Sequence, residues 1–515
     1  MAKLRYPIGI QTFSSIINGN YSYVDKTMFI PKLLDAAKYI FLSRPRRFGK
    51  SLTLSMLHSY FSAEKELFRG LAVSGSNVEW VKRPVIHFDF NASDYLQENG
   101  LEARLDASLS VYEAEYGITS ISTSFPIRFE NLIRTAYQQS GSEVAILIDE
   151  YDKPLLGIEE NAALIEKNQS TLKSLLGVLK SMDRYIHFAM LTGVARFNKV
   201  SIFSDLNNLR DISMQNDFAD ICGWTQTELE ENYAEGIRDL AQSNAMSYAE
   251  AVKKLRRMYD GYKFASSGNQ LYNPFSVLNA LASGEFGSYW FQTGTPTFLA
   301  KRIIRNRVLL PSLNHQWVEK SELEAVGIHD NDPIPLLFQT GYLTIKSTDG
   351  NEYELHFPNE EVESGFAKQL SRLCVPELND TNGDFALRKF RVDLRNGNVE
   401  SFMQRLQTMI KAIPYEQHNE KFYQNIVYLL FTLLGADARM EEHSSRGRAD
   451  LVVRMDKFIY IFEFKYNGSA EEALQQIHDK DYAGRFNVSE KEIILVGANF
   501  SGESRGLDSW LIERS

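Results

Sequence analysis

Residues 41–51 have the sequence FLSRPRRFGKS, and the last three are residue types that bind phosphate groups. An apolar run before this stretch predicts a strand and the run after it predicts a helix, which places Gly49, Lys50 and Ser51 at a strand-to-helix turn. The free backbone N–H groups of such a turn can bind a phosphate. Lys50 could reach the outer phosphate oxygens, and the Ser51 hydroxyl could bind Mg²⁺. The stretch therefore predicts a nucleotide-binding P-loop.

Arg44 departs from the general P-loop pattern, because it stands where that pattern has its first glycine. An ordinary basic loop before a helix is therefore an alternative interpretation. Residues 144–150, VAILIDE, favour the P-loop, since they predict a buried strand that ends in two carboxylates. Asp149 would hold Mg²⁺, commonly through water, and Glu150 would orient the water that attacks the γ-phosphate.

A further strand is predicted at residues 185–193. Thr192, at its carboxyl end, is expected where a side chain could sense the γ-phosphate, although a plain turn residue is the competing interpretation. Arg196 follows within reach and could stabilise charge on the phosphates, although any exposed loop can carry such an arginine.

Residues 447–465 contain a second group of residues with a definite chemistry. They predict a hairpin whose second strand alternates its side chains, so that Glu463 and Lys465 share one face. Asp450, on the first strand, can converge on them. Two carboxylates offer hard oxygen ligands for Mg²⁺, and a lysine can position water or stabilise charge on a phosphate. The alternative is a solvent-facing Glu/Lys pair on an edge strand.

The elements that must position these residues predict an α/β protein of several domains. A length of 515 residues allows about two to four domains. Strands separated by helical segments predict a parallel sheet with right-handed crossovers. The polar, turn-rich stretch 377–384 is the predicted linker. The expected parts are a P-loop domain over 1–225, a helical lid with a hairpin over 226–376, and an α/β domain over 384–515.

Two features of the middle region leave alternatives open. Residues 301–307 are the most basic short run, and we prefer a solvated helix face to a contact with nucleic acid. Residues 336–346 and 353–357 predict a hairpin after a helix. That arrangement fits either a winged helix, with contact to DNA, or a plain α+β subdomain.

The amino-acid composition limits the classes of function that this protein can have. Hydrophobic residues make up 44% of the chain and charged residues 24%, which is typical of a globular protein in water. The two cysteines, Cys222 and Cys374, lack partners at metal spacing, so neither a disulfide framework nor a zinc site is expected. The net charge of −10 argues against general coating of nucleic acid but leaves room for a local basic groove. With no recognisable signal peptide or membrane span, we expect a cytoplasmic protein without a membrane partner.

Three motifs resemble those of the bacterial AAA-ATPase-like family: YVDKT at 23–27, SRPRRFGKSL at 43–52 and DEYDKP at 149–154. In that family RPRRFGKS is the usual P-loop, which accounts for Arg44. The resemblance implies a P-loop NTPase fold that binds and hydrolyses ATP with Mg²⁺, with Glu150 as the catalytic residue. The expected ATP-binding residues are Arg46, Arg47, Phe48, Gly49, Lys50, Ser51, Asp149, Thr192 and Arg196, with Ser51 and Asp149 as metal ligands.

The C-terminal group is similar to the PD-(D/E)xK nuclease superfamily, a domain that members of the AAA-ATPase-like family usually carry. The likeness extends to Glu442 before the hairpin and to Gln476 on a helix after it. Glu420, on the preceding helix, is a further candidate ligand. The resemblance implies a restriction-endonuclease-like fold. Its implied catalytic residues are Asp450, Glu463 and Lys465, the first two as Mg²⁺ ligands.

These expectations combine into one functional hypothesis: ATP binding or hydrolysis controls a Mg²⁺-dependent nuclease that acts on nucleic acid, with DNA preferred over RNA. By analogy, defence against foreign DNA or mobile-element biology fits this architecture. One alternative is a nucleotide-switched scaffold that binds nucleic acid or protein without cleaving it, and another is an ATPase that acts on protein partners. A homo-oligomer is left open.

Overall fold

The protein is described by a computed structural model, and its chain forms two compact units. Unit 1 comprises residues 1–298 and 315–361, and unit 2 comprises residues 299–314 and 362–515. The described residues are 5–91, 93–119, 122–158, 161–197, 208–293, 297–306, 308, 310–324, 326, 332–374, 381–411, 413, 420–435, 437–443, 448–486, 491–504 and 506–514.

The core of unit 1 is a five-stranded parallel sheet with the strand order β2-β3-β4-β1-β5. Parallel strands bury both faces, and every residue of β3 is accordingly buried. Because the strands run in one direction, β1, β3 and β4 end at the same edge of the sheet. The predicted parallel α/β fold is confirmed. The strands are β1 (Tyr39–Ser43), β2 (Val85–Asp89), β3 (Val144–Asp149), β4 (Ile186–Gly193) and β5 (Arg210–Asp211).

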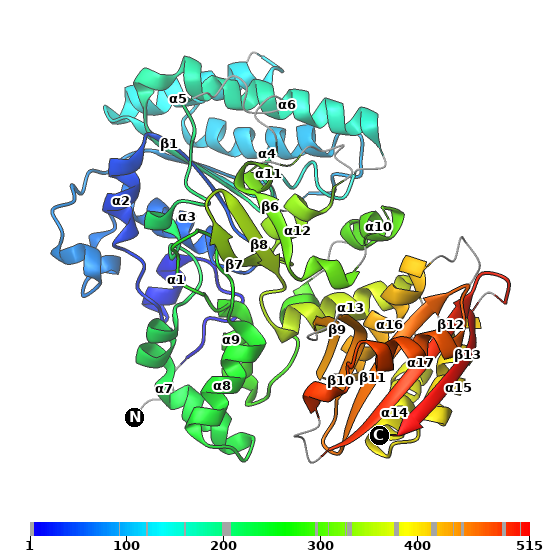
Figure 1. Ribbon diagram of the computed structural model, residues 1–515. Coiled ribbons are helices and arrows are strands. Elements are labelled where there is room, and N and C mark those ends of the chain that lie inside the picture. Colours follow the sequence, from blue (N-terminus) through cyan, green and yellow to red (C-terminus); the bar gives the residue numbers. More distant parts are fainter. Residues whose placement is uncertain are drawn as a thin grey trace. The chain divides into compact units, whose positions relative to one another are not determined.

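Helices connect and cover this sheet. Figure 1 shows α4, α5 and α6 as a layer along one side of it. Helix α3 follows β1 directly and packs on β3 and β4. The helices are α1 (Phe13–Asn18), α2 (Phe29–Ala36), α3 (Lys50–Phe61), α4 (Gly100–Glu115), α5 (Phe125–Ser140) and α6 (Ala162–Ser181).

Three further helices of unit 1 pack together: α7 (Gln226–Ser243), α8 (Tyr248–Tyr259) and α9 (Pro274–Ser283), drawn in green in Figure 1. Capping boxes begin two of them, formed by Thr225 with Glu228 and by Ser247 with Glu250. Their apolar faces form one core that includes the buried Leu240. We call α7, α8 and α9 the helical layer.

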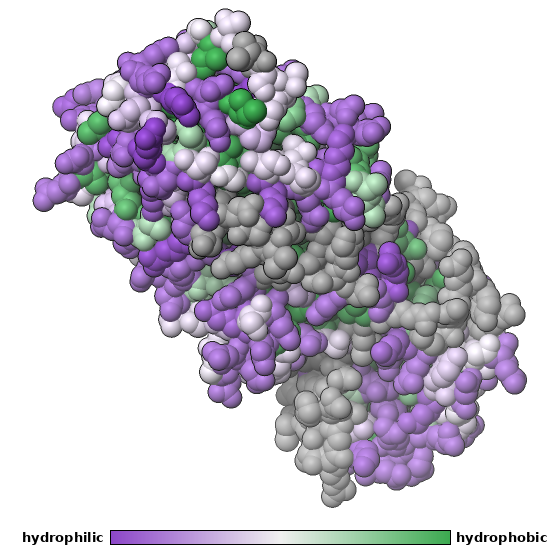
Figure 2. All heavy atoms as spheres, turned by 90° about the horizontal axis from the view of Figure 1, so that it is seen from above, coloured by the Kyte–Doolittle hydropathy of each residue, from purple (hydrophilic) through white to green (hydrophobic). Residues whose placement is uncertain are grey.

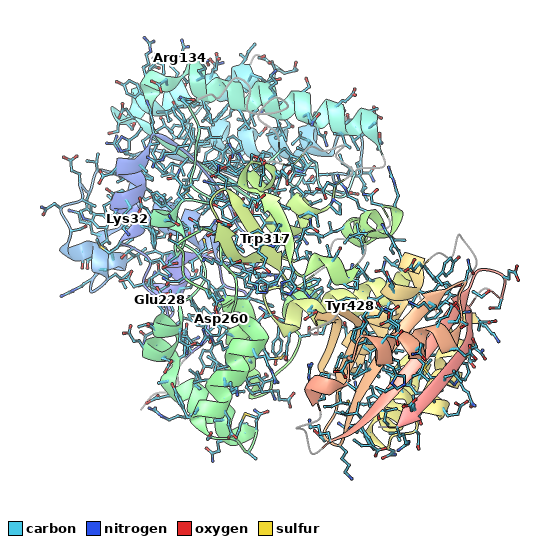
Figure 3. The ribbon with its side chains drawn as sticks, viewed as in Figure 1. Lys32, Arg134, Glu228, Asp260, Trp317 and Tyr428 are labelled. Atoms are coloured by element: carbon cyan, nitrogen blue, oxygen red, sulfur yellow. The ribbon has the colours of Figure 1, made fainter. Side chains whose placement is uncertain are left out.

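The predicted hairpin is confirmed as part of a three-stranded antiparallel sheet with the order β6-β8-β7. Trp317 lies on its edge strand β6 (Figure 3). Nearly all residues of the neighbouring α12 are buried, and Gln339 of α12 accepts a hydrogen bond from the N–H of Arg196. Helix α12 therefore offers no recognition surface for DNA. The elements are β6 (Gln316–Glu319), α11 (Lys320–Glu324), α12 (Ile334–Thr340), β7 (Thr344–Asp349) and β8 (Glu352–His356).

Unit 2 contains a mixed five-stranded sheet with the order β13-β12-β11-β10-β9. Strands β11 and β12 are parallel and joined through α17, while the other neighbours are antiparallel. Helices α14, α15 and α16 build its main apolar core against the sheet. The strands are β9 (Asp437–His443), β10 (Arg448–Arg454), β11 (Phe458–Tyr466), β12 (Glu492–Ser501) and β13 (Gly506–Arg514). The helices are α10 (Thr297–Arg305), α13 (Glu360–Cys374), α14 (Thr381–Arg395), α15 (Val399–Lys411), α16 (Glu420–Leu434) and α17 (Ala470–Asp479).

Unit 2 takes residues from two separate parts of the chain. Asn425 of α16 holds the earlier part, because it accepts a hydrogen bond from the N–H of Leu310 and donates one to the carbonyl of Val308. In the basic run 301–307, Arg305 is exposed and Ile303 is buried, so the described part of α10 has one packed face. Helix α14 begins at Thr381, inside the predicted linker, whose residues 377–380 lie outside the described part. The three-part domain division stays a prediction.

The surface drawn in Figure 2 is mostly hydrophilic, and its hydrophobic residues form small, separate groups. Among helices within the described ranges, none combines the length and the apolar character that crossing a bilayer requires.

Candidate functional site

Two residues of the P-loop, just before the start of α3, have left-handed backbone conformations: Arg47 has φ +67° and Gly49 has φ +104°. Only glycine adopts such a φ without strain, which explains Gly49 at the turn. Lys50 follows and is only 5% exposed. Its Nζ donates to the carbonyls of Arg44 (2.9 Å) and Pro45 (3.1 Å). The ammonium group therefore lies across the loop, where a phosphate could compete with these carbonyls for it.

Arg44 has a structural role that explains why it replaces a glycine. Its side chain is 1% exposed, and the guanidinium donates to the carbonyls of Ser213, Phe218 and Ala219. It also stacks on the ring of Phe264, 4.3 Å from the ring centre. Residue 44 is not among the described residues with positive φ, so its backbone does not require glycine. Burial lowers the pKa of Arg44 to about 10.

Asp149 and Thr192 meet at the carboxyl edge of the parallel sheet. The Thr192 hydroxyl donates to Asp149 Oδ1, and both side chains are buried. Asp149 Oδ1 also accepts from the N–H of Glu150 at 3.1 Å. Glu150 itself has φ +51° and lines the cavity described below. The structure thus brings the predicted sensor and the predicted metal ligand together, and it directs Glu150 toward the P-loop.

Tyr151 and Asp152 fix the turn that follows β4. Asp152 Oδ2 accepts from the N–H groups of Val194 (2.9 Å) and Ala195 (2.7 Å), and the Tyr151 hydroxyl donates to the carbonyl of Ala195. Burial is the main reason that the pKa of Asp152 is raised, to about 6. Both residues belong to the DEYDKP motif, but no role was predicted for them. The structure assigns them to holding the ends of β3 and β4 together.

Arg196, a predicted ATP-binding residue, is buried and forms an ion pair with Asp211. Its Nη1 also donates to the carbonyl of Glu324 at 3.4 Å. Its guanidinium is not among the cavity-lining groups described next. A direct role for Arg196 at the phosphates stays a prediction.

A cavity of about 260 Å³ in unit 1 adjoins the P-loop. Its lining includes residues 46–51 and Glu150, and also Asn91 and Lys153, for which no role was predicted. Lys153 could have been found from its place in the DEYDKP motif. Asn91 carried no signal, because it follows β2 in a loop. The lining of the cavity thus includes cationic and hydrogen-bonding groups of the kind that a triphosphate requires.

In unit 2, four predicted residues converge on one face of the sheet. Asp450 Oδ2 accepts from the N–H of Phe464 (2.8 Å), and Glu463 Oε2 accepts from the N–H of Asp450 (3.3 Å). Gln476 of α17 donates to Glu463 Oε1 and accepts from Lys465 Nζ at 2.5 Å. Lys465 Nζ lies 3.8 Å from Glu463 Oε1. These contacts form one connected cluster rather than an isolated Glu/Lys pair at a sheet edge.

The charges in this cluster suit a divalent cation. Glu463 is 2% exposed, and burial together with the nearby Asp450 carboxylate raises its pKa to about 8. Two carboxylates held this close repel each other unless a proton or a cation lies between them. Their hard oxygen atoms match the ligands that Mg²⁺ prefers. Asp450 and Glu463 therefore fit a Mg²⁺ site.

The structure gives less information on Glu442 and Glu420, the other two candidate residues near this cluster. Glu442 pairs with Ala449 across β9 and β10, next to Asp450, but its side chain lies outside the described part. Glu420 is exposed at the start of α16, and within the described contacts it does not reach Asp450 or Glu463. No described group of three or more His, Cys, Asp or Glu side chains is arranged to hold a metal. Among the described residues, the proposed Mg²⁺ ligands are therefore the two carboxylates of Asp450 and Glu463.

Comparisons with known proteins agree with these two sites. A family model described as a predicted AAA-ATPase matches residues 7–203, and a model of the PD-(D/E)XK nuclease superfamily matches residues 418–510. A protein of Azotobacter chroococcum mcd 1, named "Uncharacterized protein in vnfD 5'region", is 35% identical over 533 residues. This similarity covers 100% of the present chain and 99% of that protein. Each candidate site thus lies within the matching family model.

Proposed function

The chain belongs to the AAA-ATPase-like family and carries a C-terminal domain of the PD-(D/E)XK nuclease superfamily, and from this premise we propose that it hydrolyses ATP to control a Mg²⁺-dependent nuclease. The nucleic acid is proposed to be DNA. Defence or mobile-element biology is the proposed setting, and the protein acts in the cytoplasm.

The observation that supports the proposal is that one chain contains two separate groups of side chains whose chemistry suits reactions at phosphates. In unit 1, Lys50, Asp149 and Glu150 gather at the carboxyl edge of a parallel sheet. In unit 2, Glu463 and Lys465 share a cluster with Asp450 and Gln476. A scaffold that only binds its partner has no need of the second cluster.

In the ATPase reaction, residues of the chain bind and orient the triphosphate and the water. The N–H groups at the start of α3 and the ammonium of Lys50 bind the phosphates. Mg²⁺, held through Ser51 and Asp149, would neutralise negative charge on the phosphates. Glu150 accepts a hydrogen bond from the attacking water and aligns it. Thr192 keeps Asp149 in position through the hydrogen bond between them.

In the nuclease reaction, Asp450 and Glu463 hold the divalent cation, which would stabilise the charge that develops on the scissile phosphate. Lys465 orients the attacking water or stabilises the same charge. Gln476 positions Lys465 and Glu463, because it is hydrogen-bonded to both. The raised pKa of Glu463 means that cation binding releases a proton.

The test uses the full-length protein with Mg²⁺ and with single- and double-stranded DNA and RNA, in the presence and absence of ATP. Lys50→Ala and Asp450→Ala variants are compared with wild type. We expect cleavage of DNA that is lost in Asp450→Ala, and that responds to ATP only when Lys50 is intact. ATP hydrolysis should be lost in Lys50→Ala and kept in Asp450→Ala.

If ATP is hydrolysed while every nucleic acid stays intact, the nuclease part of the proposal is wrong. The protein would then be a nucleotide-switched scaffold or an ATPase that acts on protein partners. Binding measurements on the same substrates would separate these two, because only the first retains nucleic acid.

A further inference from the structure

A series of hydrogen bonds connects the P-loop to the point where the chain leaves unit 1. The indole N–H of Trp290 donates to the carbonyl of Arg46 at 3.1 Å, and the backbone N–H of Trp290 donates to Glu361 Oε1 at 2.8 Å. Glu361 is the last residue of unit 1 before the chain enters unit 2, and it lies in the first turn of α13. We propose that Trp290 and Glu361 transmit the nucleotide state of the P-loop to α13. The proposal rests on the proposed control of the nuclease by ATP and names residues that exert it.

The backbone next to Arg46 is the part of the P-loop that responds to a phosphate. In the structure the Lys50 ammonium donates to the carbonyls of Arg44 and Pro45. A phosphate that took over this ammonium would leave both carbonyls without their donor. Buried carbonyls need a hydrogen-bond partner, so we expect residues 44 and 45 to rearrange. Arg46 follows them directly, and a phosphate at Lys50 therefore acts on the short segment that Trp290 holds.

Trp290 is packed so tightly that it has to follow this segment. Its side chain is buried, and its ring centre lies 5.1 Å from that of Phe291 and 5.2 Å from that of Tyr342. Gly341, next to Tyr342, has φ +88°, and a Cβ there would lie 2.5 Å from the Pro45 side chain. The contact thus leaves no room for one methyl group. Because close-packed groups transmit displacement, a shift of the loop displaces the indole ring.

Glu361 joins the backbone around Trp290 to the start of α13. Its buried carboxylate accepts from the N–H of Tyr289 at 2.5 Å as well as from that of Trp290, and its Oε2 accepts from the Ser276 hydroxyl at 2.7 Å. A buried carboxylate that loses a donor keeps an unsatisfied charge, which is costly. The side chain of Glu361 therefore follows residues 289 and 290 rather than separating from them.

The segment before Glu361 is anchored, so a shift of Glu361 is directed into α13. Asn359 donates to the carbonyl of Asp260 at 2.8 Å, and Asp260 lies at the end of α8 (Figure 3). Gly261 has φ +101°, and a Cβ there would lie 2.1 Å from the carbonyl oxygen of Pro358. Residues 358 and 359 are thus fixed against the end of α8. The chain that is left to take up the movement is the helix that begins at residue 360.

Hydrogen exchange on the full-length protein tests the proposal, because it reports on α13 without requiring nuclease activity. The exchange of peptides covering residues 360–374 is measured without nucleotide and with Mg²⁺ and saturating ATPγS. Trp290→Phe removes the indole N–H and keeps an aromatic ring. Trp317→Phe is the matched control, because this tryptophan of unit 1 is exposed on β6 (Figure 3), and within the described residues its indole has no hydrogen bond.

In wild type and in Trp317→Phe we expect ATPγS to change the exchange rates of residues 360–374 by the same factor. In Trp290→Phe this factor should shrink by about 2- to 10-fold, the effect of losing one neutral hydrogen bond. Glu361→Ala should lose the response as well, whereas Glu361→Gln keeps an acceptor oxygen and should retain most of it. The proposal is overturned if wild type shows no response, if Trp290→Phe responds like wild type, or if Trp317→Phe loses the response equally.

Failure of the proposed function gives different results. If wild type does not bind ATPγS, the proposed ATP binding is wrong, and this inference is wrong with it. If the response depends on Trp290 but no nucleic acid is cleaved, the inference holds and the nuclease part of the proposed function is wrong. If DNA is cleaved, the ratio of cleavage rates with and without ATP should be closer to one in Trp290→Phe than in wild type. An equal ratio in the two proteins would overturn the inference and leave the proposed function intact.

Discussion

The hydroxyl of Thr192 donates a hydrogen bond to Asp149, and this contact joins the carboxyl ends of β4 and β3. Strand β4 lies between β1, which leads into the P-loop, and β3, which ends at Asp149. A displacement of one of these two strand ends would therefore also displace the side chain to which it is hydrogen-bonded on the other strand. The contact gives Thr192 a positioning role toward the proposed metal ligand, whether or not its hydroxyl also meets the γ-phosphate.

Thr192→Val keeps the size of the side chain and removes the donor to Asp149. A hydrogen bond to a charged group contributes about 1.5–3 kcal/mol, so we expect ATP hydrolysis to slow by about tenfold to a hundredfold. The affinity for ATP should change much less. Steady-state hydrolysis and equilibrium binding separate the two effects. Thr192→Ser keeps the hydroxyl and should retain most activity, and equal losses in both variants would argue against the hydrogen bond.

Arg44→Gly restores the glycine of the general P-loop pattern, yet we expect it to destabilise unit 1. It leaves the buried carbonyls of Ser213, Phe218 and Ala219 without their donor. Each unsatisfied group costs about 1–3 kcal/mol, so the free energy of unfolding should fall by more than about 3 kcal/mol. Urea denaturation measures this change. Arg47→Ala, at the exposed neighbouring arginine, is the control and should leave the stability nearly unchanged.

The buried carboxyl group of Glu361 should make the stability of unit 1 depend on pH. Its carboxylate is 1% exposed and accepts from Ser276 Oγ and from the N–H groups of Tyr289 and Trp290. Burial raises its pKa from 4.5 to about 7. The folded state therefore holds the proton more tightly than the unfolded state. The resulting stabilisation is complete below pH 4.5 and is lost as the pH rises through about 7.

The variant Glu361→Gln isolates this effect, because glutamine can accept the same N–H groups and does not titrate. We expect wild type to lose stability relative to Glu361→Gln between pH 5 and pH 8, by an amount on the order of a few kcal/mol. Unfolding curves at several pH values give the difference. A constant difference over this range would show that the carboxyl group does not titrate there.

Gln476→Leu tests the cluster in unit 2. It removes the contacts to Glu463 and Lys465 while keeping the size and helix preference of the side chain. Groups that orient metal ligands typically change activity by about 10–100-fold, and we expect a loss of cleavage in this range without weaker DNA binding. Gln475→Leu, one residue earlier and exposed, is the matched control. Equal activity of the two variants would contradict a positioning role for Gln476.

Much of the fold followed from local patterns. The strands of the parallel sheet are uninterrupted apolar runs, and their order along the chain predicted an α/β fold. Glu463 and Lys465 were placed on one face by the alternation of a strand alone. The convergence of Asp450 on them followed from the predicted hairpin. These inferences need only neighbours in sequence, which is why they succeeded.

Other features depend on contacts between distant segments. The buried partners of Arg44 lie about 170 residues later, so its departure from the P-loop pattern had no local explanation. The lining of the cavity combines Ile10 with Trp224 and Phe275, which no periodicity connects. The burial of α12 also depends on packing against other elements, and the helix-plus-hairpin pattern could not exclude contact with DNA.

The chain passes between the two units at three points, after residues 298, 314 and 361. A single exchange between two genes can transfer a domain only when that domain is one uninterrupted stretch. A junction at residue 362 would leave residues 299–314 with the other parent and break the hydrogen bonds of Asn425 to Leu310 and Val308. A transfer of unit 2 as a whole would therefore have to include residues 299–314 as well as the stretch from residue 362 onward.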